Sequence, residues 1–230
     1  MKNYIFSSLL FLSLFITAAL QADVLAEYTF TDSSFASTDA STSWTTSDLG
    51  NGVGLPLTVS ATEGNPAPGI EITFGGFDYA DLSASLVANG YYSFTITPDA
   101  GTELTFTDLT FEMYKQSGAT ATVSATIFSS IDGFATTGDA IGAGELVGGG
   151  EQSGFFLGRT VVLSSLPTVS TATEFRIYLD DGGANNSSNE FRLDNIVLNG
   201  TASVIPEPSS ILLMLGASLV FMVTARRRIK

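Results

Sequence analysis

The chain has 230 residues, of which nine are Lys or Arg and 23 are Asp or Glu, and it contains no cysteine and no histidine. The missing residue types exclude disulfides, the usual zinc ligands and any nucleophile that histidine activates. Between residues 23 and 205, four basic residues stand against 22 acidic ones, a balance that excludes nucleic acid as a partner. Divalent cations are the partners that this charge favours, although the simpler explanation is an acidic surface that maintains solubility.

Residues 1–22 have the pattern of a secretory signal peptide. Lys2 lies before an almost wholly apolar stretch from Tyr4 to Leu20, and Ala22 comes directly before the polar Asp23. A basic start, an apolar stretch and a small residue before a polar one are typical of a substrate of signal peptidase. We therefore expect export with cleavage after residue 22. Cleavage after residue 19 and retention as an uncleaved anchor are the alternatives.

Residues 23–203 are expected to form one β-structured ectodomain. Aromatic and β-branched residues alternate with polar ones, and no helical period persists. In the clearest segment Phe175, Ile177 and Leu179 share one side of a strand. The pattern predicts an all-β, two-sheet antiparallel sandwich of the jelly-roll type. The expected strands are residues 25–30, 57–59, 69–74, 91–97, 104–114, 120–128, 157–163, 174–180 and 189–198.

Two of these strands change parity partway along their length. In the last one, the apolar residues are odd-numbered before Asp194-Asn195 and even-numbered after it, which predicts a β-bulge there. A similar change in the strand at 104–114 predicts a bulge at Thr107-Asp108. The glycine-rich segment that follows residue 141 matches neither a dinucleotide-binding fingerprint nor a phosphate-binding loop. We expect this segment, residues 141–154, to be a long connection between sheets.

The C-terminal segment, residues 204–230, combines an apolar stretch with basic residues, as the N-terminus does. Pro206, Glu207 and Pro208 precede an apolar run at residues 209–225. Seventeen helical residues span about 26 Å at ~1.5 Å each, close to the ~30 Å of a bilayer core. The basic tip, residues 226–230, carries Arg226, Arg227 and Arg228. Arginines after the run stay cytoplasmic, so the preceding domain is expected outside.

This tail resembles the PEP-CTERM sorting signal. The resemblance rests on the Pro-Glu-Pro tripeptide, the single apolar helix and the terminal arginine cluster, together with the signal peptide at the other end. It implies that a membrane-bound exosortase cleaves at residues 206–208. The protein would then pass from the inner membrane to the cell surface or extracellular matrix. The alternative is a plain tail anchor in which the tripeptide occurs by chance.

The ectodomain more loosely resembles jelly-roll carbohydrate-binding modules and the ectodomains of other PEP-CTERM proteins. The likeness is carried by residues 129–134, 175–178 and 191–196. It implies a non-catalytic surface protein that binds extracellular polysaccharide. It also implies a structural calcium between the first and last strands, with Glu27 and Asp194 as ligands and Asp180 or Asp181 as less suitable ones. The competing interpretation is that Asp194 only caps the bulge by accepting hydrogen bonds from backbone amides.

Three aromatic residues are candidates for glycan binding. Trp44 lies among Ser, Thr and Asp residues, and the pair Tyr91 and Tyr92 follows a glycine. Aromatic rings stack on pyranose rings, and one of two adjacent tyrosines in a half-buried strand faces outward. The alternative for Trp44 is that its ring closes an edge of the core.

An enzyme is the second hypothesis, most plausibly a secreted glycan-active hydrolase that uses paired carboxylates. Asp180-Asp181 and the pair of Glu103 with Asp108 are the candidates. With 22 acidic residues in the ectodomain, close pairs arise by chance, and neither a nucleophile elbow nor a zinc-protease helix is present. The prediction is therefore a protein without catalytic activity. A purely structural or adhesive role without a small ligand is a third reading that the sequence does not separate from glycan binding.

Overall fold

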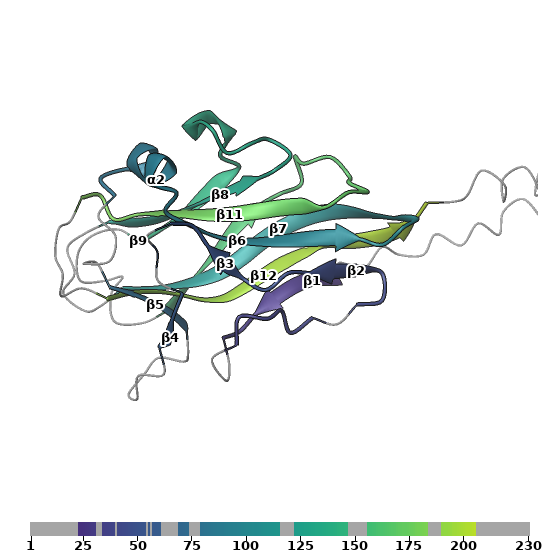
Figure 1. The fold of residues 1–230 in the computed structure, drawn as a ribbon, viewed down its shortest axis with the longest axis horizontal. Coiled ribbons are helices and arrows are strands. Elements are labelled where there is room, and N and C mark those ends of the chain that lie inside the picture. The colour runs from purple at the N-terminus through teal and green to yellow at the C-terminus, as the bar shows by residue number, and fades with distance from the viewer. Residues whose placement is uncertain are drawn as a thin grey trace, which may run out of the picture.

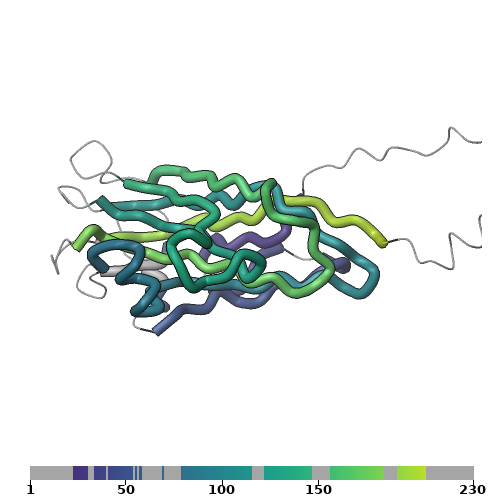
Figure 2. The backbone as a smooth tube through the Cα atoms, turned by 90° about the horizontal axis from the view of Figure 1, so that it is seen from above, coloured from purple at the N-terminus to yellow at the C-terminus, as the bar shows by residue number. Residues whose placement is uncertain are grey.

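The computed structural model describes residues 23–30, 34–39, 41–53, 55, 57–60, 69–73, 79–115, 122–146, 156–183 and 190–205. These residues form two six-stranded antiparallel sheets, and the long strands run along the long axis of the molecule (Figures 1 and 2). The prediction of an all-β fold with two antiparallel sheets is confirmed. The predicted signal peptide, sorting motif, apolar run and basic tip lie outside the described residues.

The first sheet is built around its two longest strands, which pair along most of their length. Two shorter strands, β1 and β5, lie one after the other along the far edge of β12. The order across the sheet is β10 (Phe156–Val162), β7 (Thr102–Lys115), β12 (Glu190–Val204), β5 (Gly69–Thr73) and β4 (Val59–Ser60), with β1 (Asp23–Tyr28) also paired to β12.

The second sheet has a similar plan. Two short strands, β2 and β3, share one edge of β6. The order is β2 (Trp44–Thr46), β6 (Tyr91–Pro98), β11 (Thr173–Asp180), β8 (Val123–Ser129) and β9 (Gly142–Leu146), with β3 (Gly50–Asn51) also paired to β6. Each strand predicted from sequence overlaps an observed one, although 57–59 does so by one residue because β4 begins at residue 59.

Aromatic side chains join the two sheets. Phe175 of β11 lies edge-on to Phe106 of β7, with ring centroids 5.1 Å apart, and stacks on Phe94 of β6 at 5.5 Å. All three rings are almost completely buried. The alternation of apolar and polar residues therefore places one side of each sheet in a common core, as the period-two pattern predicted.

Both predicted bulges are present. The pairing of β12 with β7 shifts register between Asp194 and Val197, and Asn195 adopts a positive φ of 47°. The same ladder shifts again where β7 passes Thr107, because Asp108 and Phe106 face consecutive residues of β12. The extra residue in each bulge keeps the apolar side chains before and after it on the core side.

The glycine-rich segment 141–154 was expected to be a connection, and this expectation is wrong for its first part. Gly142–Leu146 is strand β9, the edge of the second sheet. A Cβ on Gly144 would lie 2.8 Å from Arg159 and 2.9 Å from Phe111. Glycine is therefore required where the two sheets approach closely at this edge, and its lack of a side chain removes the alternation that marks a strand.

A short helix was also not anticipated. Helix α2 (Leu82–Ala88) lies over the outer side of the second sheet beside β8 and β11 (Figure 1). Asp81 caps its first turn by accepting a hydrogen bond from the backbone of Ala84. Asn89 ends it in the left-handed conformation, with φ 55° and ψ 45°. A 3-10 turn (Thr137–Asp139) follows β8.

Candidate functional site

The junction with the C-terminal tail is the first functional feature. Strand β12 is paired with β7 as far as Val204, which faces Thr102. The next residue, Ile205, donates its backbone N–H to the carbonyl oxygen of Gly101 at 2.7 Å. The folded domain thus extends to the residue before Pro206. No separate linker precedes the tripeptide.

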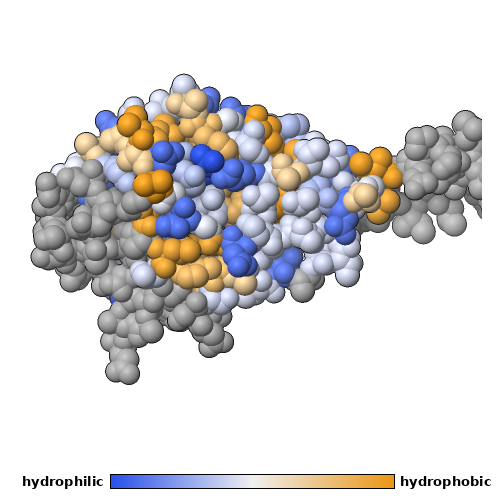
Figure 3. Space-filling view, in the orientation of Figure 1, coloured by the Kyte–Doolittle hydropathy of each residue, from blue (hydrophilic) through white to orange (hydrophobic). Residues whose placement is uncertain are grey.

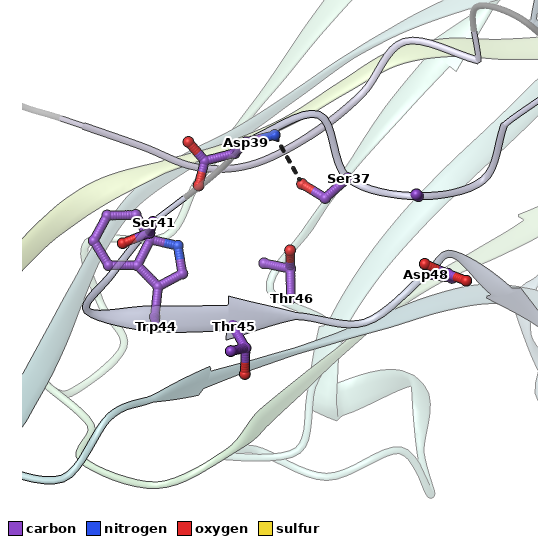
Figure 4. Close-up of a pocket in the computed structure, with 8 residues that line it drawn as sticks. Ser37, Asp39, Ser41, Trp44, Thr45, Thr46 and Asp48 are labelled. Atoms are coloured by element: carbon purple, nitrogen blue, oxygen red, sulfur yellow. Dashed lines mark hydrogen bonds between the residues drawn. The ribbon is translucent and has the colours of Figure 1, made fainter.

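A polar cleft beside Trp44 is the second feature (Figure 4). The segment 34–39 forms one wall, because Thr38 donates its N–H to Glu27 O at 2.7 Å and so holds the segment against β1. Strand β2 forms the other wall. The cleft has a volume of about 240 Å³, and its lining residues are Ala36, Ser37, Asp39, Ser41, Trp44, Thr45, Thr46 and Asp48.

Trp44 lines the cleft but does not offer an open ring face. Its side chain is only 9% exposed. The indole N–H donates to the carbonyl oxygen of Leu25 at 2.8 Å, which links β2 to β1 across the gap between the sheets. These contacts match the alternative stated above, in which Trp44 closes an edge of the core.

The polar groups of the cleft are hydroxyls and carboxylates, and none of its lining residues is basic. Burial raises the pKa of the Asp39 carboxyl; the nearby indole of Trp44 opposes this, and the charges of Glu27 and Asp23 add to it. Thr46 points toward Ser37 and Asp39 in Figure 4. Such a lining suits a neutral ligand with many hydroxyl groups, which donate to carboxylates and accept from Ser and Thr.

The two adjacent tyrosines point to opposite sides of β6, as alternation requires. Tyr92 faces the core and is completely buried, and burial raises its pKa far above the ordinary value. The prediction that Tyr92 binds glycan is therefore wrong, because a ligand cannot reach its buried ring. Tyr91 lies on the outer side and is half-buried.

Tyr91 belongs to an aromatic cluster around Arg176. The guanidinium carbon of Arg176 lies 4.3 Å from the ring centre of Tyr91 and 3.9 Å from that of Phe134, so two rings contact it. Glu174 accepts from Arg176 Nε at 2.8 Å. Sequence alternation placed Arg176 on the outer side, but the contribution of Phe134 was missed because the loop after β8 has no periodic pattern. The arrangement fixes that loop to the sheet.

Glu27 and Asp194 lie on the paired strands β1 and β12, as the calcium prediction required. Glu27 accepts a hydrogen bond from the Thr38 hydroxyl at 2.9 Å, and Asp194 accepts one from the backbone N–H of Asn195 at 2.8 Å. Calcium takes six to eight oxygen ligands. No group of three or more acidic residues positioned to hold a metal occurs in the part of the chain that the structure describes. The predicted calcium site at Glu27 and Asp194 therefore stays a prediction.

The candidate catalytic pairs have structural contacts. Asp108 accepts from the Asn199 amide at 2.8 Å, and Glu103 accepts from the Ser203 hydroxyl at 3.1 Å; both are cross-strand pairs between β7 and β12. Asp181 is completely buried and accepts from the backbone N–H of Gly183. Burial, followed by the charge of Asp181, raises the pKa of Asp180 to about 6.

Comparisons with known proteins agree with the tail assignment. Residues 204–228 match the family model of the PEP-CTERM protein-sorting motif, so the chain carries this motif. The rest of the chain lies outside that match. No curated protein sequence matches the chain. Among the described residues, no helix is long and apolar enough to span a bilayer.

Several solved structures are similar to this chain at low identity. The K3 cleaved adhesin domain of Lys-gingipain from Porphyromonas gingivalis W83 is 16% identical, with a TM-score of 0.37, covering 76% of this chain and 99% of that one. The tandem CBM22 domain of Paenibacillus barcinonensis Xyn10C is 14% identical, with a TM-score of 0.42, covering 81% and 49%. The C-terminal family 22 carbohydrate-binding module of Clostridium thermocellum Xyn10B is 12% identical, with a TM-score of 0.37, covering 80% and 97%.

Proposed function

We propose that the chain is an exported, exosortase-sorted protein of the cell surface or extracellular matrix, whose jelly-roll domain binds polysaccharide without catalysis. The observation that carries this proposal is the sorting motif, whose match begins where the last strand of the domain ends. Signal peptidase removes residues 1–22, and the apolar run 209–225 holds the chain in the inner membrane. Exosortase then cleaves at residues 206–208 and releases the domain.

The charge of the tail supports this topology. The basic tip follows the apolar run directly, and basic residues remain on the cytoplasmic side of a membrane. Proline has no backbone N–H and disfavours helix at its own position and the one before it, a property of Pro206 and Pro208 that suits cleavage at this tripeptide. The ectodomain is then on the side to which the signal peptide delivers it.

The cleft beside Trp44 is the proposed polysaccharide site. Its hydroxyls and carboxylates offer acceptors and donors to sugar hydroxyls, and a volume of about 240 Å³ suits a sugar-sized group. Trp44 lines the cleft and links β2 to β1 through its indole N–H. Tyr91, whose ring is half-buried on the outer side of β6, is a second, separate contact.

The hydrogen bonds and the burial of the candidate catalytic acids support the absence of catalysis. Glu103 and Asp108 each accept a hydrogen bond from a residue on the neighbouring strand, and Asp181 is buried. A hydrolase needs two carboxylates on either side of a scissile bond in a shared, accessible site. Turnover of glycans by the purified domain would contradict this part of the proposal.

A binding experiment tests the polysaccharide site. Trp44→Ala would also remove the hydrogen bond to Leu25, so Asp39→Asn with Asp48→Asn is the sharper variant. Asp108→Asn is the control, because it changes a carboxylate on β7 that does not line the cleft. We expect sedimentation with cell-surface polysaccharide to be lost in the double variant and kept in the control. Equal binding by all three chains, or none by the wild type, would contradict the site.

A further inference from the structure

The last two residues of the folded domain are also the first two residues of the sorting motif. The motif match begins at Val204, and Val204 is the last residue of β12. Ile205, the second matched residue, donates its N–H to Gly101 O. The N–H of Ile205 cannot be donated to Gly101 and to a protease bound at the motif at the same time, because an N–H group carries a single hydrogen.

The element that holds these residues is a tight turn between β6 and β7. Thr102 donates its N–H to Asp99 O at 2.9 Å, and Gly101 adopts a φ of 81°, which favours glycine. Asp99 in turn donates its N–H to Ser43 O at 2.9 Å, just before β2. The turn is thus fixed to both sheets.

The spacing to the apolar run is short. Only three residues lie between Ile205 and residue 209. Four extended steps reach at most about 14 Å at ~3.6 Å per residue. If the run begins at the bilayer, Ile205, which is hydrogen-bonded to the turn, lies within this distance of it, and an enzyme that cleaves at 206–208 works in that gap.

We propose that the end of the sandwich formed by the β6–β7 turn and the last residues of β12 faces the membrane-bound sorting protease, and that Val204 and Ile205 leave the ladder when the motif is processed. This rests on the proposed function. Opening exposes little new apolar surface, since Val204 is already 79% exposed and Ile205 39% exposed. Hydrophobic surface is visible at this end of the domain, where β12 ends (Figure 3).

A disulfide across the last pair tests the opening step. Because Ile205 and Gly101 form a hydrogen-bonded pair, Val204 and Thr102 form the adjacent non-hydrogen-bonded pair, with Cα atoms about 4.5 Å apart. This spacing permits a disulfide, and the chain has no other cysteine. The variant is Thr102→Cys with Val204→Cys, expressed as the full chain in its exporting host. The two single variants are the controls.

The structure predicts that the bridged variant accumulates in the inner membrane at its longer mass and that added reductant restores processing, while both single variants are processed like the wild type. Insertion of Gly-Ser-Gly-Ser after Ile205 gives a second measurement that does not depend on the bridge. The insertion moves the Pro-Glu-Pro tripeptide away from the ladder, so we expect processing to accelerate. Wild-type rates in both the bridged and the inserted variants would overturn the opening step alone. A wild-type chain that is never shortened would overturn the proposed function together with it.

Discussion

Arg159 of β10 donates two hydrogen bonds to the carbonyl oxygen of Glu145 on β9, from Nε at 2.8 Å and from Nη2 at 2.6 Å. The two strands are the edges of different sheets, so this side chain links the two sheets at one edge of the sandwich. Arg159→Ala should lower the free energy of unfolding by about 0.5–1.5 kcal/mol, the net range for a typical hydrogen bond, because both bonds are exposed to solvent. Arg159→Lys, which keeps the charge but not the planar fork, should recover only part of it. Chemical denaturation measures both, and unchanged stability in Arg159→Ala would contradict this role.

The close approach of the two sheets at this edge leads to a second prediction. Gly144→Ala places a Cβ 2.8–2.9 Å from the Arg159 and Phe111 side chains. Overpacking of this kind typically costs about 1–3 kcal/mol. Gly158→Ala on the facing strand is the matched control, because a Cβ there meets no atom within 4 Å. A loss of stability equal in the two variants would show that the steric contact is not the cause.

Stability should also depend on pH through Asp194. Burial raises the pKa of this carboxyl from 3.8 to about 6, with a further increase from the charge of Glu112 and a partial opposing effect from the Asn195 N–H. The folded state therefore holds the proton more tightly than the unfolded chain, so this group makes folding less favourable as pH rises from about 4 to 6. The difference at neutral pH is on the order of 3 kcal/mol.

The variant Asp194→Asn isolates this effect. It keeps an acceptor for the Asn195 N–H and removes the charge. We expect it to be more stable than the wild type at pH 7.5 and to approach wild-type stability at pH 4. Thermal melts across this range supply the comparison. A constant difference between the two proteins at every pH would count against the shifted pKa.

Calcium addition tests the predicted pairing of Glu27 with Asp194. A ligand that binds only the folded form stabilises it by roughly 2.7 kcal/mol at a hundredfold excess over its dissociation constant. A calcium site at these residues predicts a higher melting temperature in millimolar calcium than in chelator, with the rise lost in Asp194→Ala. Identical melts in calcium and chelator, or an equal rise in the variant, would contradict the site.

Much of the fold was predictable because period-two alternation records which side of a strand is buried. The parity change at Asp194-Asn195 predicted the bulge and even its position. Strand β9 was not predictable, because Gly142 and Gly144 carry no side chains to alternate. Helix α2 has only seven residues, too few to show a helical period, although Asp81 and Asn89 are suitable caps.

The candidate site was predictable only in part. Alternation required that one of Tyr91 and Tyr92 face outward. Phe94 and Ile96 lie on the same side of β6 as Tyr92, so the pattern was sufficient to place Tyr92 in the core. The burial of Trp44 depends on Leu25, 19 residues away in sequence and in the other sheet. Asp39 joins the cleft through a loop held by β1. Such long-range contacts leave no local pattern in a sequence.

The most direct test of sorting is the intact mass and C-terminal peptide of the wild-type protein recovered from the cell surface. We expect a chain that lacks Arg226–Lys230 and ends at or near residues 206–208, with Glu207→Ala retained in the inner membrane at the longer mass. Tail peptides that include Arg226 in surface-fraction wild-type protein would contradict it.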